Sequence, residues 1–243
     1  MVTYSRRGLH GIVLESLGPK IVSGELAPGT VLDMERLELE LSVSRTSLRE
    51  AFRVLSAKGL VDARPRHGTF VMPRTAWNVL DSDVIRWSAA GRVSQDTLAA
   101  LNEVRQIFEP SVARLAAERR QADDLDAMQD ALARLSGSVT GQRQRVDSYV
   151  SADVAFHQAL LAAAHNELLS QLAPVLEHSL RLRDTLVAHH HSPDDDDFMT
   201  AHQGVLDAVR EHDGELAEQR MRALLASAAA DVERVLAARP AQT

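Results

Sequence analysis

The chain has 243 residues, of which 45% are hydrophobic and 25% are charged, a balance typical of a folded globular protein. It contains no cysteine, which excludes disulfides, thiol catalysis and cysteine-ligated zinc. The net charge of −7 conceals a split. Residues 1–74 carry 11 basic and 8 acidic side chains, whereas residues 75–243 carry 16 basic and 26 acidic ones. This asymmetry predicts two parts with different partners.

The first part of the chain predicts three helices followed by a β-hairpin. Apolar residues three or four apart in "LHGIVLESLGPKIVSG" indicate the first helix, and "MERLELEL" indicates a short second one. Ser44 is a suitable N-cap for the third helix, "RTSLREAFRVLSAKG", which Gly59 ends. β-prone residues flank the turn "RPRHG". We therefore expect a winged helix-turn-helix over residues 1–74.

The rest of the chain predicts helices almost throughout. We expect a linker with a connecting helix over residues 75–94 and an antiparallel, all-helical bundle over residues 95–239, so the fold class is mainly α. The expected helices lie near residues 80–90, 96–120, 122–136, 145–164, 167–189, 195–212 and 215–237. No secretory signal or membrane-length apolar run is evident, so we expect a cytoplasmic protein without membrane contact.

A winged helix that binds DNA needs polar and basic side chains near the N-terminus of its third helix. Arg45, Thr46, Ser47 and Arg49 meet this requirement. Surface arginines often bind nothing, so these residues alone leave the question open. The order of motifs is more specific: "IVSGELAPGTVL", "SRTSLREAFRVLSAKGLVDARPRHGTFV" and the spacing between them resemble the winged-helix domain of GntR-type bacterial regulators over about 65 residues.

The resemblance implies which residues meet double-stranded operator DNA. The recognition helix would use its four polar or basic residues, Arg36 would hold a phosphate, and the hairpin tip would enter or approach a groove. The complete expected set is Arg36, Arg45, Thr46, Ser47, Arg49, Arg66, His67, Gly68 and Thr69.

In the acidic part, Asp153 and His157 lie one helical turn apart, and His202 lies on a later helix. One carboxylate and two imidazoles suit zinc, manganese, nickel or iron. The alternative is that Asp153 and His157 face solvent or bond to each other. The stretches "EVRQIFEPSVARLAAERRQADDLDAM", "SADVAFHQALLAAAHNELL" and "AHQGVLDAVREHDGELAEQRM" resemble the FCD effector domain of the FadR branch of GntR regulators.

This second resemblance implies that Asp153, His157 and His202 hold a divalent metal, with Zn²⁺ as the first choice. The family has a further histidine near "MRALL", where this chain has Leu224, so a three-ligand site with open positions is expected. The resemblance also implies an effector-binding role for Arg105. The alternative for Arg105 is a helical ion pair with Glu109. We place Arg105, Glu109 and Asn166 at the effector pocket.

The segments "PRTAWNVLDSDVIRW" and "HNELLSQL" resemble the branch that regulates galactonate and related sugar-acid catabolism. We therefore expect a homodimeric regulator, and specifically a repressor, that binds a pseudo-palindromic operator and senses a small carboxylate such as an aldonate. Two alternatives stay open. One is a metal-dependent hydrolase or lyase on a helical bundle, and the other is a regulator that senses a carboxylate without metal.

Overall fold

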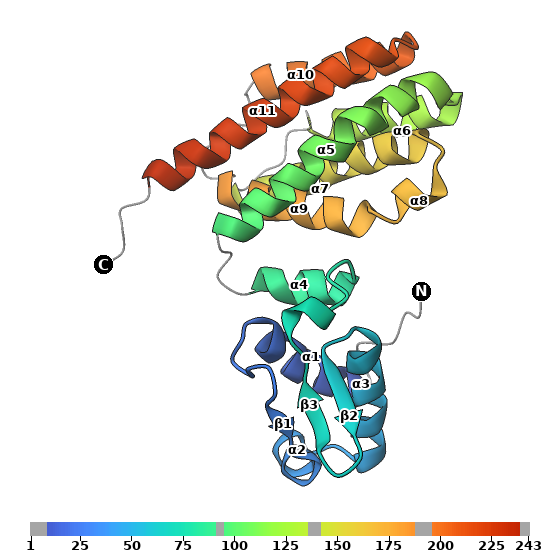
Figure 1. Cartoon of the computed structure of the whole chain (residues 1–243). Coiled ribbons are helices and arrows are strands. Elements are labelled where there is room, and N and C mark those ends of the chain that lie inside the picture. Colours follow the sequence, from blue (N-terminus) through green and yellow to red (C-terminus); the bar gives the residue numbers. More distant parts are fainter. Residues whose placement is uncertain (1–8, 91–94, 136–141, 188–195, 239–243) are drawn as a thin grey trace. The chain divides into compact units, whose positions relative to one another are not determined.

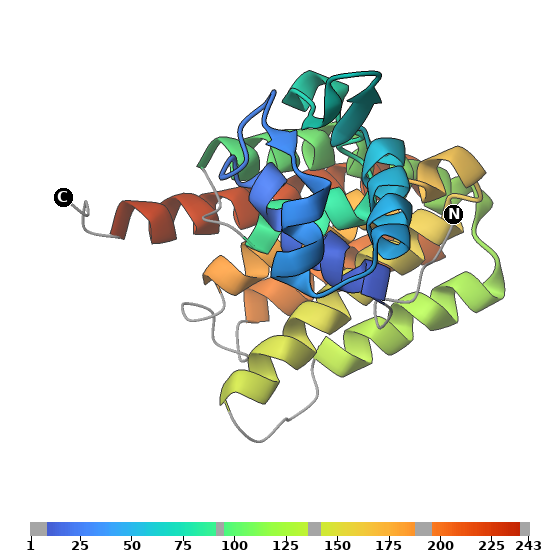
Figure 2. The same ribbon diagram turned by 90° about the horizontal axis from the view of Figure 1, so that it is seen from below.

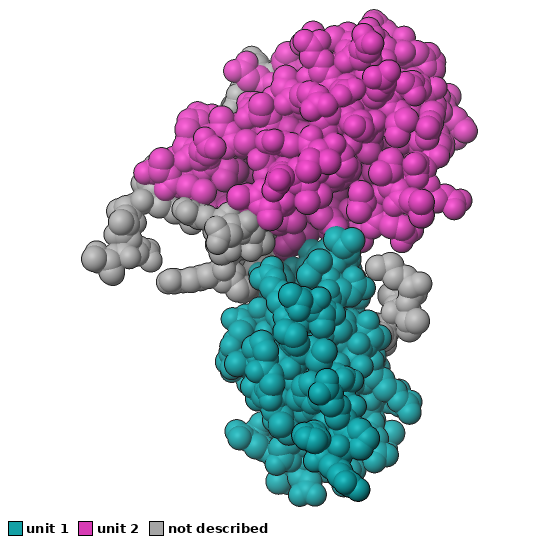
Figure 3. All heavy atoms as spheres, in the orientation of Figure 1, with its two compact units in different colours: residues 1–93 teal, residues 94–243 magenta. Residues whose placement is uncertain are grey.

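The structure is a computed structural model that describes residues 9–90, 95–135, 142–187 and 196–238 (Figure 1). The chain divides into two compact units, Met1–Val93 and Ser94–Thr243, which Figure 3 colours separately. The predicted fold class is confirmed, because a helical unit with a small antiparallel sheet precedes an all-helical one. Within the described residues, no helix is both long and apolar enough to cross a membrane.

The first unit contains the elements of a winged helix and one further helix. Its elements in chain order are α1 (Leu9–Val22), β1 (Val31–Leu32), α2 (Met34–Leu41), α3 (Arg45–Ala57), β2 (Val61–Arg64), β3 (Gly68–Val71), the 3₁₀ turn η1 (Arg74–Ala76) and α4 (Ser82–Ala90). The core lies between α1, α3, the sheet and α4, and its largest fully buried side chains include Ile21, Leu48, Leu55 and Leu60.

The sheet has the strand order β1-β3-β2, and both pairings are antiparallel. Strands β2 and β3 form the predicted hairpin, with Val61 opposite Val71 and Arg64 opposite Gly68. Strand β1 was not predicted. It has only two residues, which is too short for an alternating pattern, and it exists because Val31 pairs with Phe70 of β3.

Helix α4 packs on the winged helix through three sets of contacts. The indole of Trp87 fills the space beside Gly18 of α1, where an added Cβ would lie 2.6 Å from the ring. Arg86 forms a two-point ion pair with Glu15, and the Trp87 indole N–H donates to the same carboxylate. The buried ammonium of Lys58 lies 2.7 Å from a carboxylate oxygen of Asp81.

The second unit is a bundle of long antiparallel helices. Its elements are α5 (Gln95–Arg119), α6 (Ala122–Leu135), α7 (Gln142–Ala163), α8 (Glu167–Ser170), α9 (Ala173–Val187), α10 (Asp196–Arg210) and α11 (Gly214–Ala238). Most predicted helix limits agree within a few residues, but the single helix expected over 167–189 is wrong. Pro174 has no N–H and its ring clashes with the preceding turn, so the chain breaks into α8 and α9.

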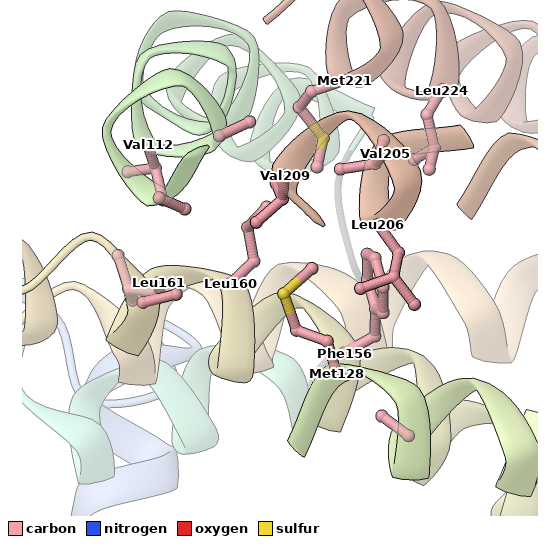
Figure 4. Packing of buried hydrophobic residues seen from close by; sticks show 14 of the residues in the cluster. Val112, Met128, Phe156, Leu160, Leu161, Val205, Leu206, Val209, Met221 and Leu224 are labelled. Carbon is pink, nitrogen blue, oxygen red and sulfur yellow. The ribbon is translucent and has the colours of Figure 1, made fainter. Parts of the chain in front are cut away.

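Helices α6 and α7 run side by side along one edge of the bundle, as Figure 2 also shows, and α11 packs along α5. The core between them is largely aliphatic. Phe156 of α7 and Met128 of α6 lie close to Leu206 of α10, while Met221 of α11 lies near Val209 (Figure 4). Close packing of this kind fixes the helices that carry the polar residues described next.

Candidate DNA interface and metal centre

The recognition helix, α3, is fixed by its cap and by its buried face. The hydroxyl oxygen of Ser44 accepts a hydrogen bond from the Ser47 N–H, which is the predicted N-cap. One face of α3 is buried through Leu48, Phe52 and Leu55. Anchoring this face leaves the opposite side of the first helical turn open to solvent.

The expected DNA-contacting residues on the helices are accessible. Arg36, Arg45, Thr46 and Arg49 are exposed, and Ser47 is half-buried. Arg36 donates to Glu40 at 2.6 Å, and the Arg45 Nε lies 3.9 Å from Glu38. The exposed Arg36–Glu40 pair contributes little, so a phosphate oxygen could replace the Glu40 carboxylate at small cost.

The hairpin tip is equally accessible. Arg66, His67 and Gly68 are exposed and Thr69 is half-buried. Arg66 and Gly68 both have a positive φ, at 67° and 74°, which turns the chain sharply between β2 and β3. The sequence and the structure therefore agree on a narrow, basic wing tip.

In the second unit, Asp153, His157 and His202 come together although His202 lies 49 residues after Asp153. The two α7 side chains share one face, and α10 brings His202 against them. Each side chain is at most 1% exposed, and one ligand atom from each lies within 4.8 Å of the others. The alternative of a solvent-facing pair is thereby excluded.

The orientation of both imidazoles is fixed by partners that accept hydrogen bonds. His157 Nδ1 lies 2.5 Å from Glu109 Oε2, and His202 Nδ1 lies 2.9 Å from the carbonyl oxygen of Phe198. A carboxylate and a carbonyl need a donor, so each Nδ1 carries a proton and each Nε2 is left to face the cluster. These outer partners are the type that orient histidine ligands at metal sites.

Both Nε2 atoms point toward the same carboxylate. Asp153 Oδ1 lies 2.9 Å from His202 Nε2 and 3.7 Å from His157 Nε2. Among the described residues, His157 Nε2 has no hydrogen-bond partner. Asp153 Oδ1 and the two Nε2 atoms therefore converge in a buried space. The donor set and its outer contacts fit a divalent metal ion.

Two arginines neutralise the two buried carboxylates. Arg105 pairs with Glu109 one turn along α5, which is the ion pair that the sequence offered as an alternative, and Arg183 Nη2 lies 2.8 Å from Asp153 Oδ2. Burial raises the pKa of Glu109, but the charge of Arg105 and the hydrogen bond from His157 outweigh it and lower the pKa to about 2. Burial also opposes the ionisation of Asp153, but Arg183 and His202 hold the Asp153 pKa well below its usual range.

For His202, burial lowers the pKa, and the contact with Asp153 offsets this only in part. The neutral form of this imidazole is therefore favoured. A neutral imidazole is also the form that binds a metal ion.

Two cavities adjoin this cluster. The larger, about 430 Å³, lies between α5, α9 and α11 and is lined in part by Arg105, Ser179 and Arg183. Its volume is within the range of about 300–1,000 Å³ typical of ligand sites. The smaller, about 100 Å³, is lined in part by Arg183, Phe198 and Leu224. Arg183 lines both cavities.

Asn166 is not brought to this cluster, although it was expected in the effector pocket. Its side-chain oxygen accepts hydrogen bonds from the N–H groups of Leu168 and Leu169, so it is the N-cap of α8. Asparagine is among the preferred N-cap residues because its short side chain reaches these donors. Neither described cavity includes it.

Sequence reasoning missed Arg183. A signal for it exists in α9, where Leu176, Ser179, Leu180 and Val187 form a buried stripe at helical spacing and Arg183 occupies a position of that stripe. A charged residue at a buried position requires a partner. That its partner would be Asp153 depends on packing between α7 and α9.

The chain matches two protein-family models. Residues 11–71 match "Bacterial regulatory proteins, gntR family", and residues 100–227 match the FCD domain. The chain is 34% identical over 219 residues to the galactonate operon transcriptional repressor of Escherichia coli K12, covering 88% of this chain and 93% of that one. It is 39% identical over 153 residues to the transcriptional regulator LutR of Bacillus subtilis, covering 63% and 66% respectively.

A solved structure described as "Lar controls the expression of the Listeria monocytogenes agr system and mediates virulence" is similar, with a TM-score of 0.64 and 20% identity over 95% of this chain and 99% of that one. This likeness concerns the fold. The relatives are transcriptional regulators, so the expectation of a regulator rather than an enzyme is confirmed. The chain belongs to the gntR family of bacterial regulatory proteins, with an FCD domain after its winged helix, and it is a DNA-binding transcriptional regulator.

Proposed function

We propose that this regulator is a cytoplasmic, homodimeric repressor of genes for sugar-acid catabolism, released from its operator by an aldonate-like carboxylate bound beside a divalent metal ion. The sugar-acid class is supported by the similarity to the galactonate operon repressor over most of both chains. The metal-centred sensor is supported by the geometry of the second unit.

The observation that carries the metal assignment is the convergence of two imidazole Nε2 atoms on Asp153 Oδ1. Asp153, His157 and His202 would hold the ion, and zinc is preferred for this donor set, with manganese, nickel or iron as alternatives. Leu224 supplies no fourth donor. A bound ion would therefore keep positions to which a carboxylate and a hydroxyl oxygen of an effector can bind.

Arg105 is the proposed second contact of the effector. It is 2% exposed, it lines the larger cavity, and its Nη2 has no hydrogen-bond partner among the described residues. A buried guanidinium with an unused donor is suited to a carboxylate. Glu109 keeps a different role, because its two oxygens are occupied by Arg105 and His157. We assign Glu109 to holding His157 in position.

The exposed surface of the first unit would bind the operator. Residues at the N-terminus of α3 would enter the major groove, and the wing tip would contact an adjacent groove or backbone. A homodimer would place two such surfaces on a pseudo-palindrome. Because binding energies are linked, an effector that weakens operator binding must itself bind less tightly to the DNA-bound protein. The proposed contacts are Arg36, Arg45, Thr46, Ser47, Arg49, Arg66, His67, Gly68 and Thr69.

The test combines metal analysis with operator binding by the full chain. Protein purified without chelator should contain about one equivalent of divalent metal, and Asp153→Ala should contain almost none. Galactonate should release wild-type protein from DNA of its own promoter region only when metal is present. Release that persists in chelator-treated protein would favour the metal-free sensor, and no release by any sugar acid would overturn the effector class.

DNA contact is tested separately with Arg49→Ala, because Arg49 is exposed and forms no ion pair with any described residue. We expect a loss of about 1–3 kcal/mol of operator affinity if Arg49 reads a base. The matched control is Arg53→Ala on the same helix, which lies outside the proposed contact set. A loss that is equal on all sequences would make Arg49 a phosphate contact.

A further inference from the structure

The outer face of the small sheet carries an aromatic side chain at its centre. Val61 and Val71 lie opposite each other and are buried on the inner face. Side chains alternate along a strand, so Asp62 and Phe70, which also lie opposite each other, are on the outer face. Phe70 belongs to β3, the middle strand, and has Val31 of β1 on its other side (Figure 1). Phe70 is half-buried, but it is not one of the described side chains that pack against the hydrophobic core, so it is available for contacts on the surface.

Arg64 stacks on this aromatic side chain. Its guanidinium carbon lies 5.1 Å from the centre of the Phe70 ring, within the range of a cation–π contact. Its Nε lies 3.8 Å from a carboxylate oxygen of Asp62, and the two side chains are 65% and 45% exposed. An ion pair this long and this exposed contributes little. The ring therefore limits where the guanidinium lies, while most of the Arg64 side chain remains open to solvent.

The position of Arg64 in the hairpin places it directly behind the wing tip. It is the last residue of β2 and lies opposite Gly68, the first residue of β3. Arg64 and Arg66 are two residues apart, which is at most about 7 Å of extended chain. The minor groove of B-DNA is about 7.5 Å deep. A wing whose tip reaches the floor of such a groove therefore holds Arg64 at the level of the phosphates along the rim.

We infer that Arg64 binds a phosphate of the DNA backbone beside the wing, and that Phe70 is the residue that positions it. The inference rests on the proposed contact between the wing and the operator, and it adds a residue outside the contact set given above. A guanidinium suits this role because its planar array of donors matches phosphate oxygens in pairs. Stacking on a ring reduces the conformational freedom that the side chain loses when it binds.

The test measures binding of the full chain to labelled DNA of its own promoter region, and to an unrelated duplex of the same length, over a series of salt concentrations. We expect Arg64→Ala to bind both DNAs about tenfold more weakly, through the loss of one charge-assisted hydrogen bond. Because one phosphate contact is lost, the slope of log affinity against log salt concentration should become shallower by about 0.9. The matched control is Arg53→Ala, which removes another exposed arginine and should change neither quantity. An unchanged slope in Arg64→Ala would overturn the inference.

Two further variants separate charge from positioning. Arg64→Lys keeps the positive charge and should keep the wild-type slope, but it should recover only part of the affinity because an ammonium does not stack as a planar guanidinium does. Phe70→Leu keeps an apolar side chain on the outer face and should weaken binding by at most about fivefold, with the slope unchanged.

The double variant of Arg64→Ala and Phe70→Leu tests the positioning role. Without a guanidinium to hold, the loss of the ring should add nothing to the effect of Arg64→Ala. A purely structural role of Phe70 would cost the same affinity in both backgrounds, and that result would overturn the positioning role. Thermal melts of every variant establish that the winged helix is folded before binding is compared.

Arg66→Ala distinguishes failure of this inference from failure of the proposed wing contact. If Arg66→Ala weakens operator binding and Arg64→Ala does not, the wing contacts DNA and only the role of Arg64 falls. If neither variant changes the affinity or the slope, the wing contact and the inference fall together.

Discussion

Each unit of this protein buries a group of charged side chains, but the two groups have different surroundings. In the first unit, the side chain of Lys58 is 6% exposed, whereas the side chains of its partners Asp81 and Asp83 are 21% and 16% exposed. In the second unit, Arg105 and Glu109 are both 2% exposed, and Asp153 and His157 are fully enclosed. The first group reaches water and the second does not.

The difference separates a structural charge cluster from one suited to a ligand. Lys58, Asp81 and Asp83 fasten α4 to the winged helix, and solvent can replace part of a lost contact. In the second unit, an imidazole nitrogen of His157 and a guanidinium nitrogen of Arg105 lack a hydrogen-bond partner among the described residues. Glu38 Oε1 and Arg86 Nε of the first unit also lack a partner among the described residues, so the distinguishing feature of the second unit is the convergence of two imidazole nitrogens on the Asp153 carboxylate.

The largest effect is expected for Glu109→Ala. The substitution leaves Arg105 buried without a counter-charge and releases His157, so we expect a loss of about 3–5 kcal/mol of unfolding free energy in urea. The matched control is Glu118→Ala, which removes the carboxylate of the exposed pair Arg114–Glu118 at the same helical spacing on α5. That change should cost less than about 1 kcal/mol. If both variants lost the same unfolding free energy, burial of the charged cluster would add nothing to its contribution to stability.

The second effect is stabilisation by metal. Free Zn²⁺ at one hundred times its dissociation constant should stabilise the folded second unit by about 2.7 kcal/mol, because the ion binds the folded state. We expect differential scanning calorimetry to show the shift in wild type and its absence in Asp153→Ala. A shift of the same size in the variant would place the ion elsewhere, and the comparison between the two charge groups would fail.

The third effect is expected for Lys58→Met. Because Asp81 and Asp83 can recover some hydration after the ammonium is removed, the loss should be smaller than that of Glu109→Ala, at about 2 kcal/mol. Operator binding and urea unfolding of the full chain are the measurements. A loss larger than that of Glu109→Ala would reverse the proposed ranking of the two groups.

The smallest effect is a pH dependence in the first unit. A hydrogen bond from Arg86 lowers the pKa of Glu15, and bonds from Lys58 and Arg86 outweigh burial to lower the pKa of Asp83. Stability from these acids is complete above their unfolded pKa values, 4.5 and 3.8, and is lost as pH falls through the lower folded values. Since Arg86 and Glu15 are more than a third exposed, the change should stay below about 1 kcal/mol.

The measurement for this last prediction is urea unfolding at pH 6.5 and pH 3.5. Wild type should lose more stability between the two conditions than Arg86→Met, in which one source of both pKa shifts is removed. An identical loss in the two proteins would mean that these carboxylates titrate as they do in the unfolded chain.

Local chemistry made much of the molecule predictable from its sequence. Ser44 is the N-cap of α3 because the cap bond joins residues three apart, and the hairpin follows from β-prone residues around a turn. The one-turn spacing of Asp153 and His157 placed both side chains on one face of α7, and Arg105 pairs with Glu109 for the same reason. Each of these features depends on a few neighbouring residues.

Features that join distant segments depend on how the helices and strands pack against one another. Strand β1 is too short to predict and exists through pairing with β3. The contacts of Glu109 with His157 and of Arg183 with Asp153 span 48 and 30 residues. The helical period of a sequence predicts which face of a helix is buried, but not which other helix covers that face. The packing of the core determines the covering helix.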